Sequence, residues 1–247
     1  MPSTEIYLLV PLIFLAALIF SAVGHGGASG YLAAMALMNV APESMRPAAL
    51  VLNIFVASIA IYKFYGIGAF SWRIFIPLVI ASVPMAYVGG LISLPNHFYK
   101  PIVGLVLIFS AIHIFTQAKK DYQLNPILAS TPLLLGIGAI LGLLAGLTGI
   151  GGGVLLSPLL IFFKWAETKV ISGVAAAFIL ANSISGLIGV LTKQSVMPGA
   201  LPYWIIAAVL GGLIGADYGS RRLGNPAIKK LLSLVLLLAG SKMLLAL

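Results

Sequence analysis

Two glycine clusters interrupt long apolar segments at corresponding places in the two halves of the chain. Glycine permits a positive φ and lets a ligand approach the backbone closely. A helix that resumes after such a break presents free N–H groups and the positive end of its dipole, which together favour an anion. The clusters are Gly24-His25-Gly26-Gly27-Ala28-Ser29-Gly30 and Gly149-Ile150-Gly151-Gly152-Gly153. They predict an anion site formed by Gly26, Gly27, Gly151, Gly152 and Gly153.

Glycine also lets helices pack closely in membranes, and that is the alternative role for these residues. Paired interruptions of apolar segments in two halves of a membrane protein are more typical of a transporter's substrate site. The matched clusters therefore favour binding. We expect Gly152→Val to abolish binding and Gly142→Ala, in the preceding helix, to be milder.

Polar side chains beside the breaks, or inside apolar helices, could complete such a site. Buried amides and hydroxyls in hydrocarbon need partners and usually face the bundle interior. They either line a substrate cavity or hydrogen-bond between helices. Asn53 and Asn182 are 129 residues apart, as are Asn96 and Asn225, which suggests matching positions in the two halves. We expect leucine at Asn53 or Asn182 to lower transport more than it lowers stability. The candidate residues are Ser29, Asn53, Thr148, Asn182, Ser183 and Ser185.

His25 lies inside the first cluster, where the second cluster has Ile150. An imidazole titrates near neutral pH, so His25 could hold an anion as a cation or relay a coupling proton. A neutral ring that is satisfied by a backbone carbonyl is the alternative.

The composition is that of an all-α polytopic membrane protein. Hydrophobic residues make up 61% of the chain and charged residues only 8%, against about 25% charged in soluble domains. Several apolar runs reach the ~18 residues of a membrane span. The expected helical segments lie at 6–39 (with the first break), 48–65, 74–92 and 99–115, and then at 127–163 (with the second break), 170–191, 203–216 and 228–247.

The halves, 1–118 and 126–247, are predicted to be inverted repeats joined by a polar linker at 119–125. If each broken segment is a hairpin that returns to its starting side, ten cations share one side and three lie on the other. The positive-inside rule favours this arrangement. Each repeat then has a glycine-broken hairpin and three transmembrane helices.

Asp217 and Arg221 are spaced for an ion pair on one helix.

Other function classes lack support in the sequence. The chain has no cysteine, and no hydrolase, zinc or phosphate-loop motif is apparent. The sequence therefore predicts no enzyme, no cofactor and no metal site. The net charge is +9, and the cations that produce it lie between the apolar segments. Nucleic acid is therefore not expected as a partner. The expected partners are the lipid bilayer and a small anionic substrate, and a homodimer is one assembly that the sequence leaves open.

The segment Gly146-Leu147-Thr148-Gly149-Ile150-Gly151-Gly152-Gly153-Val154, followed by Leu156-Ser157-Pro158-Leu159, strongly resembles the sulfite exporter TauE/SafE family. The first cluster resembles it more loosely, because His25 and Ala28 stand where glycine is common. The tract Gly211-Gly212-x-x-Gly215-Ala216 and the closing apolar helix are also similar.

The resemblance implies a multi-pass permease of the bacterial inner membrane that exports small sulfur-containing anions such as sulfite or organosulfonates. Alternating access between the two repeats and coupling to the proton gradient are the expected mechanism. An anion channel, or a membrane enzyme or assembly factor, is the alternative function.

Overall fold

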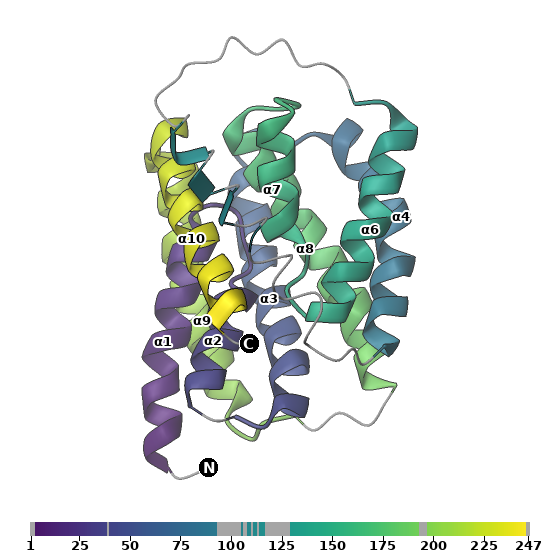
Figure 1. The fold of residues 1–247 in the computed structure, drawn as a ribbon. Helices are drawn as coiled ribbons and strands as arrows, with labels where there is room; N and C mark the ends of the chain where they lie inside the picture. Colours follow the sequence, from purple (N-terminus) through teal and green to yellow (C-terminus); the bar gives the residue numbers. More distant parts are fainter. Residues whose placement is uncertain are drawn as a thin grey trace.

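The computed structural model describes residues 3–38, 40–92, 105, 108–109, 111–112, 114–116, 129–192 and 197–245. All regular structure within these residues is helical, which confirms the all-α prediction (Figure 1). Five of the described helices are long and apolar enough to cross a membrane. They are α3 (Pro42–Tyr65), α4 (Trp72–Leu91), α6 (Thr131–Thr148), α8 (Thr168–Leu191) and α9 (Leu201–Asp217) with its π-helical extension η1 (Tyr218–Arg222). The predicted helix at 99–115 and the linker at 119–125 fall largely or wholly outside the described residues.

The two glycine clusters separate pairs of helices, as predicted. α1 (Ser3–Ser21) is followed by the short α2 (Ala28–Leu37), and α6 is followed by the short α7 (Gly153–Phe162). The short helices have 10 residues each. α1 rises and α2 returns toward the lower end of the bundle, whereas α6 descends and α7 returns toward the upper end (Figure 1).

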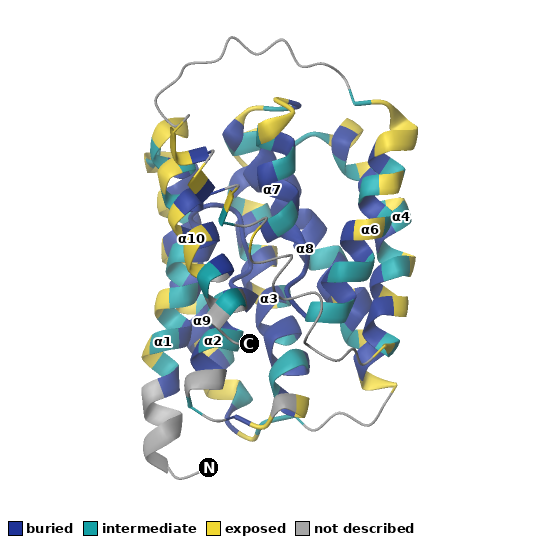
Figure 2. Ribbon diagram, viewed as in Figure 1, coloured by how far each residue is buried: buried dark blue, intermediate teal, exposed yellow. Residues whose placement is uncertain are grey.

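α3 and α8 form the centre of the bundle and run in opposite directions. Near one end of the pair Phe64 faces Gly173, and near the other Leu50 lies beside Gly186. Between these points Asn53 contacts Ser183. The two helices are equally long, at 24 residues each. Figure 2 shows that buried residues concentrate along α8 and the neighbouring part of α7.

Two further helix pairs pack closely through glycine. On α6, Gly138, Gly142 and Gly146 lie against the main chain of α4, so that a Cβ at any of them would overlap a carbonyl oxygen. On α9 and η1, Gly211, Gly215 and Gly219 lie in the same way against α1 and the residue after it. Small residues at such spacing let membrane helices approach closely. Gly142 is therefore a packing residue, and alanine there would require the two helices to shift apart.

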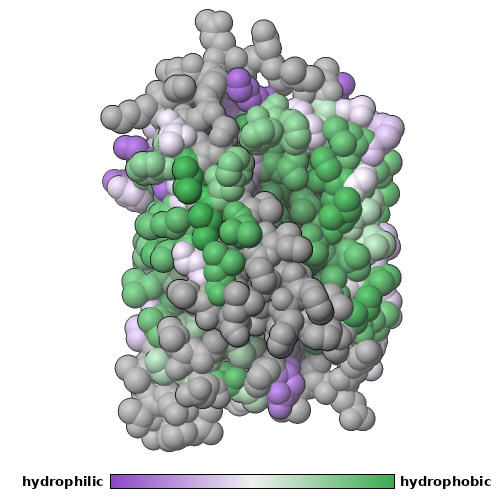
Figure 3. Space-filling model, viewed as in Figure 1, coloured by the Kyte–Doolittle hydropathy of each residue, from purple (hydrophilic) through white to green (hydrophobic). Residues whose placement is uncertain are grey.

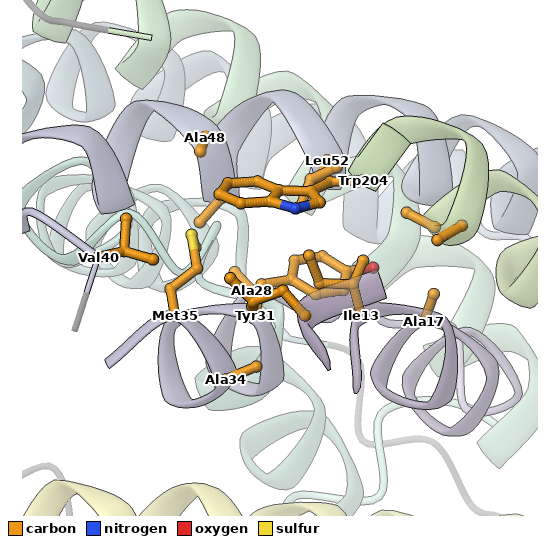
Figure 4. Close-up of a cluster of buried hydrophobic side chains, with 14 of the residues drawn as sticks. Ile13, Ala17, Ala28, Tyr31, Ala34, Met35, Val40, Ala48, Leu52 and Trp204 are labelled. Carbon is orange, nitrogen blue, oxygen red and sulfur yellow. The ribbon is translucent and has the colours of Figure 1, made fainter. Parts of the chain in front are cut away.

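The N-terminal helices enclose a cluster of large apolar side chains. Trp204 of α9 lies over Tyr31 of α2, and Leu52 of α3 and Ile13 of α1 lie beside them (Figure 4). All four side chains are fully buried. This cluster fixes α2 between α1, α3 and α9. The last helix, α10 (Asn225–Leu245), packs against the breaks through a second cluster that contains Val23, Ile150, Ile228 and Leu232.

Charged residues lie near the ends of the helices, and a hydrophobic band lies between them (Figure 3). Most of the described cations are near the upper end in Figure 1, where α3 ends and α4, α8 and α10 begin. Arg46, near the start of α3, is at the lower end.

Asp217 pairs with Lys63 at 2.6 Å and with Arg221 at 3.5 Å. The predicted pair between Asp217 and Arg221 is confirmed, and Lys63 joins it from α3.

Candidate functional site

The first break is a tight turn that requires glycine. Gly24 has φ +77° and Gly27 has φ +99°, a conformation that glycine adopts without the penalty of a Cβ. The N–H of His25 donates to the carbonyl of Phe20 at 2.9 Å. A Cβ at Gly24 would overlap the carbonyl of Ser172 in α8. The first break is therefore held directly against the second half of the chain.

The second break contains three glycines in the left-handed region. Gly149, Gly151 and Gly152 have φ of +72°, +81° and +77°. Thr148 holds the turn, because its Oγ1 donates to the carbonyl of Leu144 at 2.8 Å and accepts the N–H of Ile150 at 3.2 Å. Thr148 thus has a structural role, and its hydroxyl is occupied by the backbone.

Asn53 of α3 connects the two breaks. Its Oδ1 accepts the N–H of Ala28, the first residue of α2, at 3.0 Å. Its Nδ2 lies 3.3 Å from the carbonyl oxygen of Ile150 and 3.4 Å from Oγ of Ser183. The side chain is fully buried. Asn53 therefore caps the N-terminus of α2 and ties it to the second break.

The N-terminus of α7 lacks a corresponding cap. In α8 the position of Asn53 is taken by Ile179, because each residue stands eleven places after the first residue of its helix. Ile179 lies against Gly151 and Gly153 through its apolar atoms. Among the described residues no side chain caps α7 at Gly152. The first N–H groups of α7, on Gly153 and Val154, are of the kind that a helix cannot satisfy internally.

His25 reaches from the first break to α7. Nδ1 lies 3.0 Å from the carbonyl oxygen of Val23, and Nε2 lies 3.1 Å from the carbonyl oxygen of Gly153. Oγ of Ser157 lies 3.3 Å from Nε2. Both side chains are buried. The contact between His25 and Gly153 joins the two predicted halves at the start of α7.

The other predicted site residues divide into two groups. Ser183 contacts Asn53 and lies beside Gly151, so it belongs to the region where the breaks meet. Ser29 is buried in the first turn of α2. Ser185 instead donates to the carbonyl of Val83 in α4 at 2.5 Å. Asn182 donates to the carbonyl of Phe178 at 2.8 Å, while its buried Oδ1 has no hydrogen-bond partner within the described part of the chain.

A small cavity lies beside the second break. Its volume is about 10 Å³, the room of about one water molecule. Residues of α6, the break and α7 line it, among them Thr148, Ile150, Gly152 and Val154. This cavity, at the N-terminus of α7, is smaller than a sulfonate.

Arg46 is a functional candidate that the sequence did not single out. Its guanidinium donates to the carbonyl of Gly89 at 2.7 Å and to that of Ile92 at 3.2 Å, at the end of α4. It also donates to the carbonyl of Gly146 in the last turn of α6. A cation at a helix C-terminus complements the helix dipole. Arg46 therefore holds α4 and α6 together beside the second break.

The sequence profile of the family described as "Sulfite exporter TauE/SafE" matches residues 9–243. The chain belongs to this family. A TauE/SafE assignment agrees with the broken helices and the five candidate spans. It makes the protein a multi-pass membrane transporter rather than an enzyme.

Relatives of this TauE/SafE protein carry consistent names. A "Probable membrane transporter protein" of Sinorhizobium fredii is 39% identical over 245 residues, which cover 98% of this chain and 99% of that protein. One from Methanocaldococcus jannaschii is 28% identical over 212 residues, covering 77% and 76%. One from Bacillus subtilis is 24% identical over 250 residues, covering 90% and 92%. No solved structure matches the chain.

Proposed function

We propose that this protein carries small sulfur-containing anions, such as sulfite or organosulfonates, across the membrane by alternating access. The family description supports the substrate class. The observation that carries the proposal is the uncapped N-terminus of α7, which meets the first break at Gly153 through His25. A sulfonate or sulfite has several oxygens that could accept the N–H groups of Gly153 and Val154, and the dipole of α7 favours its charge.

The proposed binding site is the region where the two breaks meet. It comprises the backbone of Gly26, Gly27, Gly151, Gly152 and Gly153, with Asn53 and Ser183 holding the breaks together and Ser29 nearby. Asn182 would contact the anion along its path, because its Oδ1 is buried and has no hydrogen-bond partner among the described residues. Thr148 and Ser185 support the helices around the site.

Inverted repeats give this site access to either side in turn. Three features support an inverted relation between residues 1–118 and 126–247. The hairpins α1–α2 and α6–α7 open at opposite ends of the bundle (Figure 1). α3 and α8 run in opposite directions. α1 packs on α9, as α6 packs on α4. Rocking of one repeat against the other around a central site is the usual mechanism of such folds.

The small size of the cavity beside the second break supports a carrier rather than a channel. Its volume of about 10 Å³ is too small for a sulfonate, so an anion that binds there requires the surrounding helices to move. A carrier makes that movement in every cycle. The surplus of cations at the upper end supports a cytoplasmic location for that end under the positive-inside rule. We propose the bacterial inner membrane as the location and the proton gradient as the driving force.

Binding of methanesulfonate and of sulfite to purified protein tests this function. Each ligand should raise the unfolding temperature with increasing concentration, because a ligand that binds only the folded state stabilises it. Gly152→Val should remove the effect, since valine resists φ +77° and its Cβ would lie 2.9 Å from Cε1 of Phe178. Gly136→Val is the matched control, because Gly136 has open space around it. Equal ligand responses in the two variants would refute the proposed site.

A further inference from the structure

The imidazole of His25 has more acceptors around it than a neutral ring can use. The carbonyl oxygens of Val23 and Gly153 lie 3.0 and 3.1 Å from the two ring nitrogens. A carbonyl oxygen can only accept a hydrogen bond, and a neutral imidazole has one N–H. Only the imidazolium, with two N–H groups, donates to both carbonyls at once.

Ser157 supplies what the neutral ring needs. Its Oγ lies 3.3 Å from Nε2, and a hydroxyl can donate to the lone pair of an unprotonated nitrogen. With the proton on Nδ1, His25 donates to Val23 and accepts from Ser157. With a second proton on Nε2, it donates to Gly153 as well. The pocket therefore has a hydrogen-bond arrangement for each of the two protonation states.

Charge decides when the second proton can bind. The ring is fully buried, and a buried charge without a partner is costly. An anion at the N-terminus of α7 would lie close to Nε2, because Nε2 already contacts Gly153, the first residue of that helix. The imidazolium and the anion would then neutralise each other, and each would lower the cost of burying the other.

Other titratable side chains of the described structure lie on the helices around the first break. The hydroxyl of Tyr31 on α2 donates to the carbonyl of Gly26, the residue after His25, at 2.6 Å. Lys169 of α8 is directed to the carbonyl of Ser220 at 2.9 Å. Lys229 and Lys230 stand near the upper end of α10, and Arg46 is bound to the ends of α4 and α6. Lys63 pairs with Asp217. None of these groups contacts the imidazole.

We propose that His25, with Ser157 and the carbonyls of Val23 and Gly153, is a proton-binding site, and that one proton enters it together with each anion. This inference rests on the proposed anion site and adds the group that would couple transport to a proton gradient. The step is a simple protonation: Nε2 accepts a proton from solvent while the break is open, and returns it when the anion leaves.

Isothermal titration of the purified protein with methanesulfonate tests the proposal, because the charge of this anion does not change between about pH 5 and pH 8, where histidine titrates. Affinity should rise by up to about tenfold for each unit that the pH falls, as linkage to one proton requires. Titrations in two buffers with different ionisation enthalpies should report uptake of close to one proton per anion. This second measurement needs no variant.

Two variants identify the proton acceptor. His25→Gln should bind methanesulfonate with an affinity that no longer depends on pH. Ser157→Ala removes the donor to the neutral ring, so the midpoint of the pH dependence should move to higher pH. Tyr31→Phe, the control, should keep the parent pH profile.

The outcomes separate the two proposals. Binding by the parent without proton uptake, or the same pH dependence in His25→Gln as in the parent, would overturn the role of His25 and leave the anion site standing. An unmoved midpoint in Ser157→Ala would remove Ser157 from the site. No binding by the parent at any pH would refute the anion site, and the proton inference with it.

Discussion

Asn53 and Ile179 occupy the same position in two helices of equal length, but only Asn53 caps the N-terminus of a short helix. Oδ1 of Asn53 accepts the N–H of Ala28 at 3.0 Å, whereas Ile179 presents apolar atoms to Gly153. The two breaks therefore have similar backbones and different chemistry. The protein itself satisfies the start of α2, and the start of α7 is left for a ligand in our proposal.

This difference can be removed by Ile179→Asn. An amide at this position could cap α7 and would compete with the anion for its N–H groups. A side-chain cap stabilises a helix by about 0.5–2 kcal/mol, so we expect the affinity for methanesulfonate to fall about tenfold. The measurement is a binding titration, with Ile179→Leu as a control that keeps an apolar side chain. Unchanged affinity in Ile179→Asn would argue against an anion at this helix end.

Asn53 and Asn182 should respond differently to leucine. Asn53→Leu leaves the buried N–H of Ala28 without its acceptor, and we expect a loss of about 1–3 kcal/mol in stability. Asn182→Leu removes an oxygen that has no hydrogen-bond partner in the described structure, so stability should be kept while transport falls. Thermal unfolding and uptake into proteoliposomes would measure the two effects. Equal losses of stability in the two variants would contradict this distinction.

Gly215 should be intolerant of even the smallest side chain. A Cβ at Gly215 would overlap the carbonyl of Leu18 on α1, and overpacking of this kind costs about 1–3 kcal/mol. Gly215→Ala should therefore lower the unfolding temperature clearly. Gly136→Ala should not, because nothing lies within 4 Å of the added Cβ. Similar unfolding temperatures for the two variants would mean that α1 and α9 do not pack as closely as described.

The inverted topology can be tested by labelling single cysteines, since the chain has none of its own. Glu43 stands at the start of α3, and Lys164 stands between α7 and α8 at the opposite end of the bundle. In whole cells, an impermeant maleimide added outside should label Glu43→Cys and leave Lys164→Cys unlabelled until the membrane is permeabilised. Labelling of both from outside would contradict the inverted arrangement.

Much of the fold could be predicted from composition and from glycine. The apolar runs indicated the helices, and the glycine clusters indicated both breaks, because long apolar segments and positive-φ glycines are local properties of the sequence. Helix starts were less well placed. α3 begins at Pro42 rather than near residue 48, since proline suits the first turn of a helix and polar residues at a helix start interrupt the apolar pattern.

The register between the halves was harder to predict. A spacing of 129 residues paired Asn53 with Asn182, but α3 and α8 begin 126 residues apart, at Pro42 and Thr168. Asn182 therefore stands three residues further along its helix than Asn53 does. The polar contacts of the site also escaped prediction, because they join distant segments. Ser157 lies within a motif that was recognised by its glycines, yet its partner His25 is 132 residues away.

The most direct test of the central claim is to locate a bound anion. Selenite is the heavier analogue of sulfite, and its selenium atom can be placed by anomalous scattering in crystals grown with it. Our account predicts one selenium position, with the selenite oxygens within hydrogen-bond distance of the backbone N–H groups of Gly153 and Val154, and a lower occupancy of that position in crystals of Ile179→Asn grown at the same selenite concentration. A selenium site elsewhere in the bundle, with this helix end empty, would contradict the account.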